Sequence, residues 1–168
     1  VINKENKVIC LPPVKSFDLT NDSNISTESQ ENEIVYETLL DGTMVNLFYN
    51  NDKWLISTRS EIGGYNKWQD KKSFREMFDE CCNLDENALD KTISYSFVMR
   101  HKENRNVTPI YDNILILVEA YQYKDDTIKR INVSQFKHYD CEVVDQYTSK
   151  DEFMKLFEGP VIPYYIKG

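Results

Sequence analysis

The chain has 168 residues, a length that suits one domain and is short for two. Its 40% hydrophobic and 29% charged residues, with a mean hydropathy of −0.58, are typical of a globular protein and speak against a membrane protein. A formal net charge of −8 excludes general adhesion to phosphate backbones, so any contact with nucleic acid needs a local basic patch.

Targeting and cysteine patterns point to the inside of a cell. The chain does not open with a basic start followed by an apolar block, which argues against a signal peptide. The four cysteines form no C-x-x-C pair, so neither a zinc site nor a disulfide framework is indicated. We expect a reducing, cytoplasmic location, no membrane partner and, because position 1 is valine, further native chain beyond one or both ends.

The first half of the chain predicts strands separated by turns. Val8–Leu11 is a short strand stopped by Pro12-Pro13, and the polar stretch 21–33 indicates a solvated loop. Apolar and β-branched runs then predict a meander of antiparallel strands at 34–40, 43–49 and 54–58.

The second half predicts two helices among further strands. Ser73–Glu76 and Ser149–Glu152 are capping boxes, each followed by apolar residues at helical spacing, and the second helix is expected to end at Gly159. Extended patterns cover 92–99, 114–123, 128–131 and 161–166. The predicted fold class is α+β, dominated by antiparallel sheet, in a single domain over residues 1–168.

Four blocks of the chain resemble, in their order and spacing, the motifs of a known enzyme family. They are VICLPPVKSFDL, LLDGTMVNLFY, KWLISTRSEIGG and YSFVMRHKENRNV. They are similar to the bacteriophage-type RNA ligase family of the covalent nucleotidyltransferases, and to lysine-lacking ligase-like proteins of large DNA viruses. The resemblance implies an antiparallel-sheet nucleotidyltransferase (ATP-grasp-like ligase) fold with a few flanking helices, which holds ATP between sheets and handles RNA ends. It also implies a viral setting, such as a viral factory or a virion.

The nucleophile of that family is missing from its expected position. In these ligases a lysine amine attacks the α-phosphate of ATP, magnesium offsets the charge, and the adenylate passes to a 5′-phosphate on RNA. Leu39 stands at the lysine's place in the Lys-x-Asp-Gly pattern, and its side chain has no lone pair. Ser96 stands where the resemblance implies a glutamate that contacts ribose or metal, and a hydroxyl is a weak magnesium ligand. A lysyl adenylate therefore cannot form at residue 39.

Other positions keep the family's residue types, and each also has an ordinary structural explanation. Lys15 and Arg59 match cations beside the nucleotide, or are surface charges at strand ends. Asp41 and Gly42 match the family's nucleotide-binding acid and glycine, or form the turn of a hairpin between two strands.

Two residues near the C-terminal end match metal-binding and phosphate-binding positions of the family. Glu158 matches a metal-binding carboxylate of the family, and Lys167 matches a closing phosphate-binding lysine. The alternative for Glu158 is a place at the end of the capped helix that stops at Gly159.

A small cationic loop is a candidate nucleic-acid contact. Arg100, Lys102 and Arg105 lie in this loop, which either meets RNA or is a solvated turn between strands. Tyr95 and Phe97, in the preceding strand, are expected to pack on the sheet or to stack on bases.

Three functional hypotheses follow. In the first, the domain binds a nucleotide or an RNA 5′-phosphate end without lysine adenylation, with ATP and Mg²⁺ as candidate ligands. In the second, it is a non-catalytic structural module with a protein partner in a viral or cellular assembly. In the third, it is an active ATP-dependent RNA ligase completed by missing segments.

Overall fold

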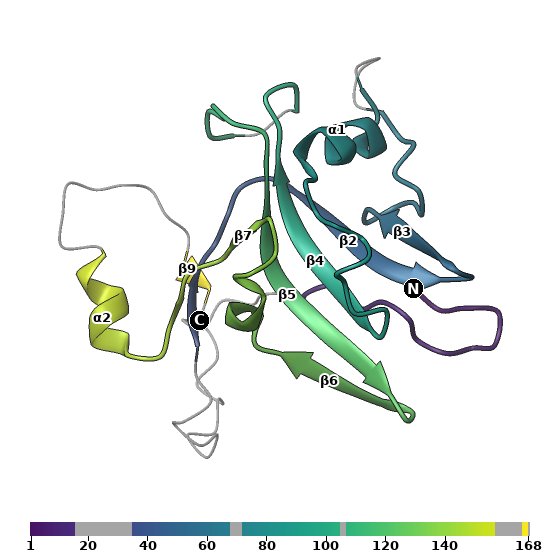
Figure 1. The fold of residues 1–168 in the computed structure, drawn as a ribbon. Coiled ribbons are helices and arrows are strands. Elements are labelled where there is room, and N and C mark those ends of the chain that lie inside the picture. The colour runs from purple at the N-terminus through teal and green to yellow at the C-terminus, as the bar shows by residue number, and fades with distance from the viewer. Residues whose placement is uncertain (16–34, 68–71, 105–106, 157–165, 168) are drawn as a thin grey trace. The chain divides into compact units, whose positions relative to one another are not determined.

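The fold is that of a computed structural model, which describes residues 1–15, 35–67, 72–104, 107–156 and 166–167 (Figure 1). Contacts between residues divide the chain into two compact units. The first unit consists of Val1–Pro13 with Asp41–Val144, and the second of Val14–Leu40 with Asp145–Gly168. The expected single domain over 1–168 stays a prediction.

A six-stranded sheet forms the first unit. Its strand order is β3-β2-β4-β5-β6 with antiparallel neighbours, and β7 pairs in parallel with β5. The elements of this unit are β2 (Thr43–Asn50), β3 (Lys53–Ser57), α1 (Phe74–Cys81), β4 (Ile93–Arg100), β5 (Ile114–Lys124), β6 (Thr127–Ile131), the 3₁₀ helix η3 (Val133–Phe136) and β7 (Glu142–Val143). The predicted α+β class with mostly antiparallel sheet is confirmed.

Two tight turns join neighbouring strands of this sheet. Asn51 and Asp52, between β2 and β3, both have positive φ, and so do Asp125 and Asp126 between β5 and β6. Two successive residues of positive φ make the turn whose twist matches that of the flanking strands, and asparagine and aspartate tolerate this geometry. These residues therefore fix the register of both hairpins.

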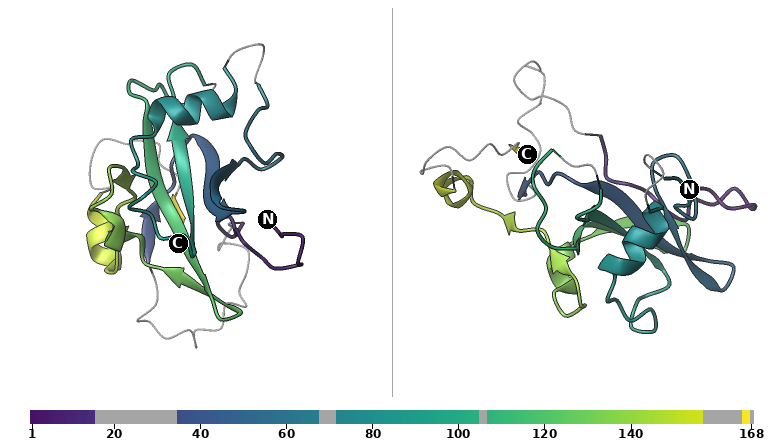
Figure 2. Two further views of the ribbon diagram at one scale, coloured as in Figure 1. Left: turned by 45° about the vertical axis from the view of Figure 1, so that its right-hand side comes forward. Right: turned by 90° about the horizontal axis from the view of Figure 1, so that it is seen from above.

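The face of the sheet that α1 and η3 cover carries the larger part of the hydrophobic core. Tyr95, Phe97 and Met99 alternate along β4 onto this face and are at most 1% exposed. Helix α1 lies across the strands (Figure 2), with the Phe78 ring 6.5 Å from that of Phe97, and η3 brings the Phe136 ring to 5.5 Å from Tyr95. Removing these aromatic surfaces from water stabilises the unit.

The capping box of α1 is confirmed. The Glu76 amide donates to Ser73 Oγ over 3.2 Å, and the Ser73 amide donates to Glu76 Oε2 over 2.7 Å. Met77, Phe78 and Cys81 then form the buried face of the helix.

A bulge interrupts the pairing of β4 with β5. Phe97 pairs with Leu117, whereas Ser96 pairs with Glu119, so Val118 is an extra residue on β5. The alternation of side chains shifts by one residue at this point. Glu119 consequently lies on the same face of the sheet as Ser96, opposite the core.

The second unit contains a small sheet of its own. Strand β1 (Tyr36–Thr38) lies between β8 (Gln146–Tyr147) and β9 (Ile166–Lys167), antiparallel to both. Helix α2 (Lys150–Lys155) begins after Ser149, whose Oγ accepts from the Glu152 amide over 3.4 Å. The Phe153 ring stacks on Tyr36 at 5.3 Å between centroids and contacts Tyr147 at 5.7 Å.

Three expectations about local structure are wrong. Val8 makes an isolated bridge with Ile2, so Val8–Leu11 is not a strand. The run 34–40 does not join the meander, because β1 pairs with β8 and β9. Asp41-Gly42 is for the same reason not a hairpin turn, since β2 pairs with β3 and β4 instead. The predicted end at Gly159 and most of the strand at 161–166 lie outside the described residues.

Within the described residues, no helix is long and apolar enough to cross a membrane.

Candidate functional site

A row of polar side chains crosses the face of the large sheet that lies opposite the hydrophobic core. The register places Ser57, Asn46, Ser96 and Glu119 side by side on β3, β2, β4 and β5, and all of them are buried. Ser96 Oγ donates to Asn46 Oδ1 over 2.8 Å, and Asn46 Nδ2 donates to Ser57 Oγ over 3.4 Å. Ser96 is thus an integral member of this row, which we call the polar row.

Glu119 ends the polar row with a carboxylate that is only partly paired. It is 5% exposed, and its Oε1 accepts from Arg130 Nε over 2.6 Å. Its Oε2 is buried and has no hydrogen-bond partner among the described residues. Burial, followed by the negative charge of Glu119 and a side-chain hydrogen bond with this residue, raises the pKa of Tyr121 to about 12. Oε2 is therefore an acceptor that a ligand could use.

Arg100 places a cation on the same face of the sheet. Ser96, Val98 and Arg100 alternate onto this face along β4. At the rise of about 3.3 Å per residue in a strand, Arg100 lies about 13 Å beyond Ser96. Its Nε is buried and makes no hydrogen bond within the part of the chain that the structure describes. Buried polar atoms without a hydrogen-bond partner are few in folded proteins, and Arg100 and Glu119 supply a donor and an acceptor of this kind.

Residues 9–11 cover one end of this face. The Leu11 amide donates to the Tyr123 hydroxyl over 2.7 Å, and Ser94 Oγ lies 3.1 Å from the same oxygen. Cys10 is buried beside them, and burial raises the pKa of its thiol to about 11. This thiol is therefore poorly suited to act as a nucleophile.

Asp41 fastens the loop between β4 and β5. Its Oδ2 accepts hydrogen bonds from the amides of Val107 and Thr108, each over 2.8 Å, and from Thr108 Oγ1 over 3.0 Å. The hydrogen bond from the Thr108 amide is the largest cause of the lowered pKa of Asp41, and the charge of Arg100 contributes to it. A role in binding ribose stays a prediction, while the loop contact is what the structure shows.

Gly42 allows two strands to approach closely. A Cβ at this position would lie 2.6 Å from Val98 Cγ1 and 2.8 Å from the Met99 carbonyl oxygen. It would also lie 3.4 Å from Arg100 Cγ, so Gly42 and Arg100 are neighbours. A side chain here would push β4 away from the start of β2.

Sequence reasoning missed a network around the buried residue His101. His101 is 1% exposed, and its Nδ1 accepts from the Glu103 amide over 3.1 Å while its Nε2 lies 2.9 Å from Glu80 Oε2. Because Nδ1 is an acceptor, Nε2 carries the proton and donates to Glu80. Lys72 binds Glu80 and Glu103, and its hydrogen bond is the largest cause of the lowered pKa of Glu80, followed by that of His101.

This network and two further contacts hold the β4–β5 loop in place. Asn104 Nδ2 donates to Thr43 Oγ1 over 2.6 Å, and the Lys102 amide donates to Asn113 Oδ1 over 3.0 Å. The Lys102 side chain is exposed at the start of this loop, where its backbone is fixed to Asn113. A cation carried on such a loop is positioned in advance of any contact with an anion.

Three further predicted site residues are exposed, and they are divided between the two units. Arg59 is exposed on the loop after β3, in the first unit. Lys15 is exposed and Leu39 is 44% exposed, and both belong to the second unit.

Arg105 and Glu158 lie outside the described residues. Only the backbone of Lys167 is described, where it pairs with Glu37 in the small sheet. No three His, Cys, Asp or Glu side chains of the described residues come together as a metal site.

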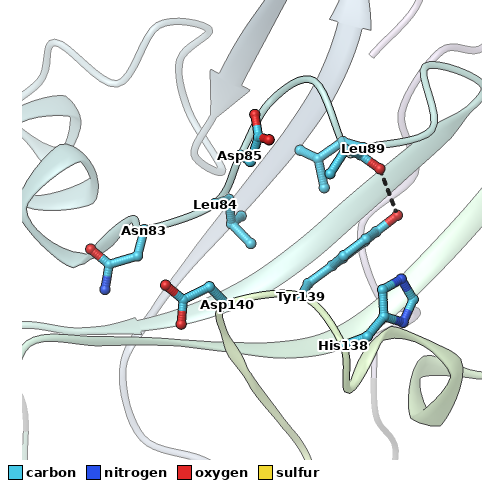
Figure 3. Close-up of a pocket in the computed structure, with 8 residues that line it drawn as sticks. Asn83, Leu84, Asp85, Leu89, His138, Tyr139 and Asp140 are labelled. Atoms are coloured by element: carbon cyan, nitrogen blue, oxygen red, sulfur yellow. Dashed lines mark hydrogen bonds between the residues drawn. The ribbon is translucent and has the colours of Figure 1, made fainter.

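A separate pocket lies between the loop after α1 and the segment after η3. Side chains from both segments line this pocket (Figure 3), which has a volume of about 320 Å³. The Tyr139 hydroxyl donates to the Ala88 carbonyl oxygen over 3.3 Å at its wall. Its lining residues are Asn83, Leu84, Asp85, Ala88, Leu89, His138, Tyr139 and Asp140. None of the predicted site residues lines it.

Comparison with models of protein families gives no match to this chain, and comparison with curated proteins gives none either.

Proposed function

We propose that the polar face of the six-stranded sheet binds a nucleotide or the 5′-phosphate end of an RNA without becoming bonded to it. On this proposal the chain is an RNA ligase-like nucleotidyltransferase domain that no longer forms a lysyl adenylate. The observation that carries it is the pair of buried, unpaired atoms on one face, Arg100 Nε and Glu119 Oε2.

The two atoms have the chemistry that a nucleotide needs. A guanidinium donates charge-assisted hydrogen bonds to phosphate oxygens, and a carboxylate oxygen accepts from ribose hydroxyls or from a base amino group. Leaving either atom unpaired and buried costs about 1–3 kcal/mol, which a ligand with both kinds of group would offset. The side-chain hydrogen bonds of the polar row join β2, β3 and β4, and Glu119 lies next to this row, opposite Ser96.

Chemistry at residue 39 separates this proposal from an active ligase. Leu39 presents hydrocarbon where an amine would be required, so ATP bound by the domain stays unmodified. Incubation with labelled ATP and Mg²⁺ is expected to give no covalent adduct. A labelled band that disappears when a lysine is replaced would show that adenylation survives and would contradict the proposal.

Calorimetry with ATP, GTP and a short 5′-phosphorylated RNA tests binding directly. Arg100→Ala and Glu119→Gln are each expected to weaken binding of at least one of these ligands by about tenfold, the effect of losing one hydrogen bond that involves a charged group. Lys129→Ala is the matched control, because Lys129 is an exposed cation of β6 opposite Gln122, away from the polar face. Absence of binding by the unaltered chain, or equal loss in the control, would overturn the proposal in favour of a structural module.

A further inference from the structure

The loop between β3 and α1 is held by its own backbone. The Gly63 amide donates to the Ile56 carbonyl over 2.8 Å, and the Arg75 amide donates to the Gly64 carbonyl over 2.8 Å. Within the loop, the Asn66 amide donates to Glu61 Oε2 over 2.7 Å. Residues 58–67, which we call the Tyr65 loop, are thus tied to β3 on one side and to α1 on the other.

Tyr65 stands out from this loop with one side of its ring supported. Its side chain is 69% exposed, yet a Cβ at Gly63 would meet the ring at Cε2 and would lie 2.8 Å from Cδ2. The ring therefore rests against the Gly63 backbone. Gly63 and Gly64 have φ of +101° and +71°, a backbone that only glycine adopts readily and that brings the ring into this position.

The Tyr65 loop is less acidic than the chain as a whole. It contains two cations and one acidic residue, Glu61, whereas the whole chain has a net charge of −8. Lys67, two residues after Tyr65, and Arg59, near the start of the loop, are both exposed. An aromatic ring flanked by cations on an otherwise acidic protein is suited to a negatively charged partner with flat, stackable groups.

We propose that the Tyr65 loop binds single-stranded RNA, with a base stacked on the Tyr65 ring and a neighbouring phosphate paired with Lys67. The choice of RNA rests on the function proposed above, and the loop adds to it a contact with the strand away from its 5′ end. A base in a single strand has its flat face available, whereas a base in a duplex is already stacked on both sides. The supported ring loses little freedom when a base stacks on it, which favours binding.

The test measures binding of a labelled single-stranded RNA without a 5′-phosphate by fluorescence anisotropy at low salt. Tyr65→Ala is expected to weaken binding by about tenfold, the effect of losing one stacked base, and Tyr65→Phe is expected to bind like the unaltered chain. Lys67→Ala is expected to weaken binding and to reduce its dependence on salt. Tyr111→Ala is the control, because Tyr111 is 77% exposed on the β4–β5 loop.

Several outcomes would overturn this inference. One is that the Tyr65→Ala chain binds the RNA as tightly as the unaltered chain, and another is that Tyr111→Ala weakens binding as much as Tyr65→Ala does. The other two are that the unaltered chain binds a duplex of the same sequence as tightly as the single strand, and that it binds no RNA. Calorimetry with ATP separates the two proposals, because Tyr65→Ala is expected to leave ATP binding unchanged. If the Arg100→Ala chain no longer binds ATP but still binds the RNA through Tyr65, the Tyr65 loop is a binding site that is independent of the polar face.

Discussion

The Asp41 carboxylate holds the β4–β5 loop through a single oxygen atom, which accepts three hydrogen bonds. These donors favour the charged form and lower the pKa of Asp41 below its ordinary value of 3.8. A group whose pKa falls on folding stabilises the protein above the unfolded-state pKa. That stability is lost as the pH falls through the lower, folded-state pKa.

Asp41→Asn is expected to lower the free energy of unfolding by about 1 kcal/mol at pH 7, because an amide oxygen is a weaker acceptor and solvent screens this site. The difference from the unaltered chain is expected to stay constant down to about pH 4 and to shrink as the pH falls further. Urea unfolding of both chains at several pH values between 7 and the acid range measures this difference in unfolding free energy. A difference that grows in acid would contradict the assignment.

Two histidines differ in environment and provide a matched pair. His101 is buried with both ring nitrogens in hydrogen bonds, whereas His138 is exposed beside Tyr139. His101→Ala is expected to cost roughly 2 kcal/mol of unfolding free energy, because it leaves the Glu103 amide without its acceptor and the Glu80 carboxylate with Lys72 alone. His138→Ala is expected to change stability by less than about 0.5 kcal/mol.

Nitrogen NMR provides an independent check of the His101 network. The spectrum is expected to show an unprotonated Nδ1 and a protonated Nε2 for His101, since only that tautomer satisfies both contacts. The opposite tautomer would mean that the Glu103 amide is bonded elsewhere.

At the scale of elements, local signals located most of the first unit. The Ser73–Glu76 capping box predicted α1, and alternation predicted β2 to β6 to within two residues at each end. The partners of β1 could not be predicted in this way, because β8 and β9 are two residues long and carry no periodic pattern. Asp41-Gly42 was wrongly predicted as a hairpin turn because its sequence suits a turn. Its position in the fold is set instead by contacts with residues 98–108, which local sequence does not reveal.

The candidate site was predictable only in part. Arg100 was identified from the charge of its loop, and Asp41 from a resemblance in the surrounding motif. Glu119 was missed because it lies in an apolar run and reaches the polar face only through a register shift, which depends on pairing between distant strands. Asn46 and Ser57 were missed because a single polar residue in a strand gives no signal until its neighbours across the sheet are known.

At the scale of the whole molecule, the first unit has its sheet within residues 41–144. A chain shortened to residues 1–144 is therefore expected to keep this sheet, and its amide NMR signals from β2 to β5 are expected to stay dispersed. A chain ending at Ile131 is the control, because it loses Val133 and Phe136 from the core and is expected to unfold. Collapse of the signals in the longer chain would mean that the first unit depends on the second.

The bulge in β5 makes the candidate site tolerant of a shorter chain at one place. Deleting Val118 alone would restore regular pairing with Leu117 still opposite Phe97 and Glu119 still opposite Ser96, so the carboxylate would stay on the polar face. Loss of this single codon would thus keep the inner and outer lining of the strand on both sides of the deletion, whereas the same loss from a strand without a bulge would exchange them on one side.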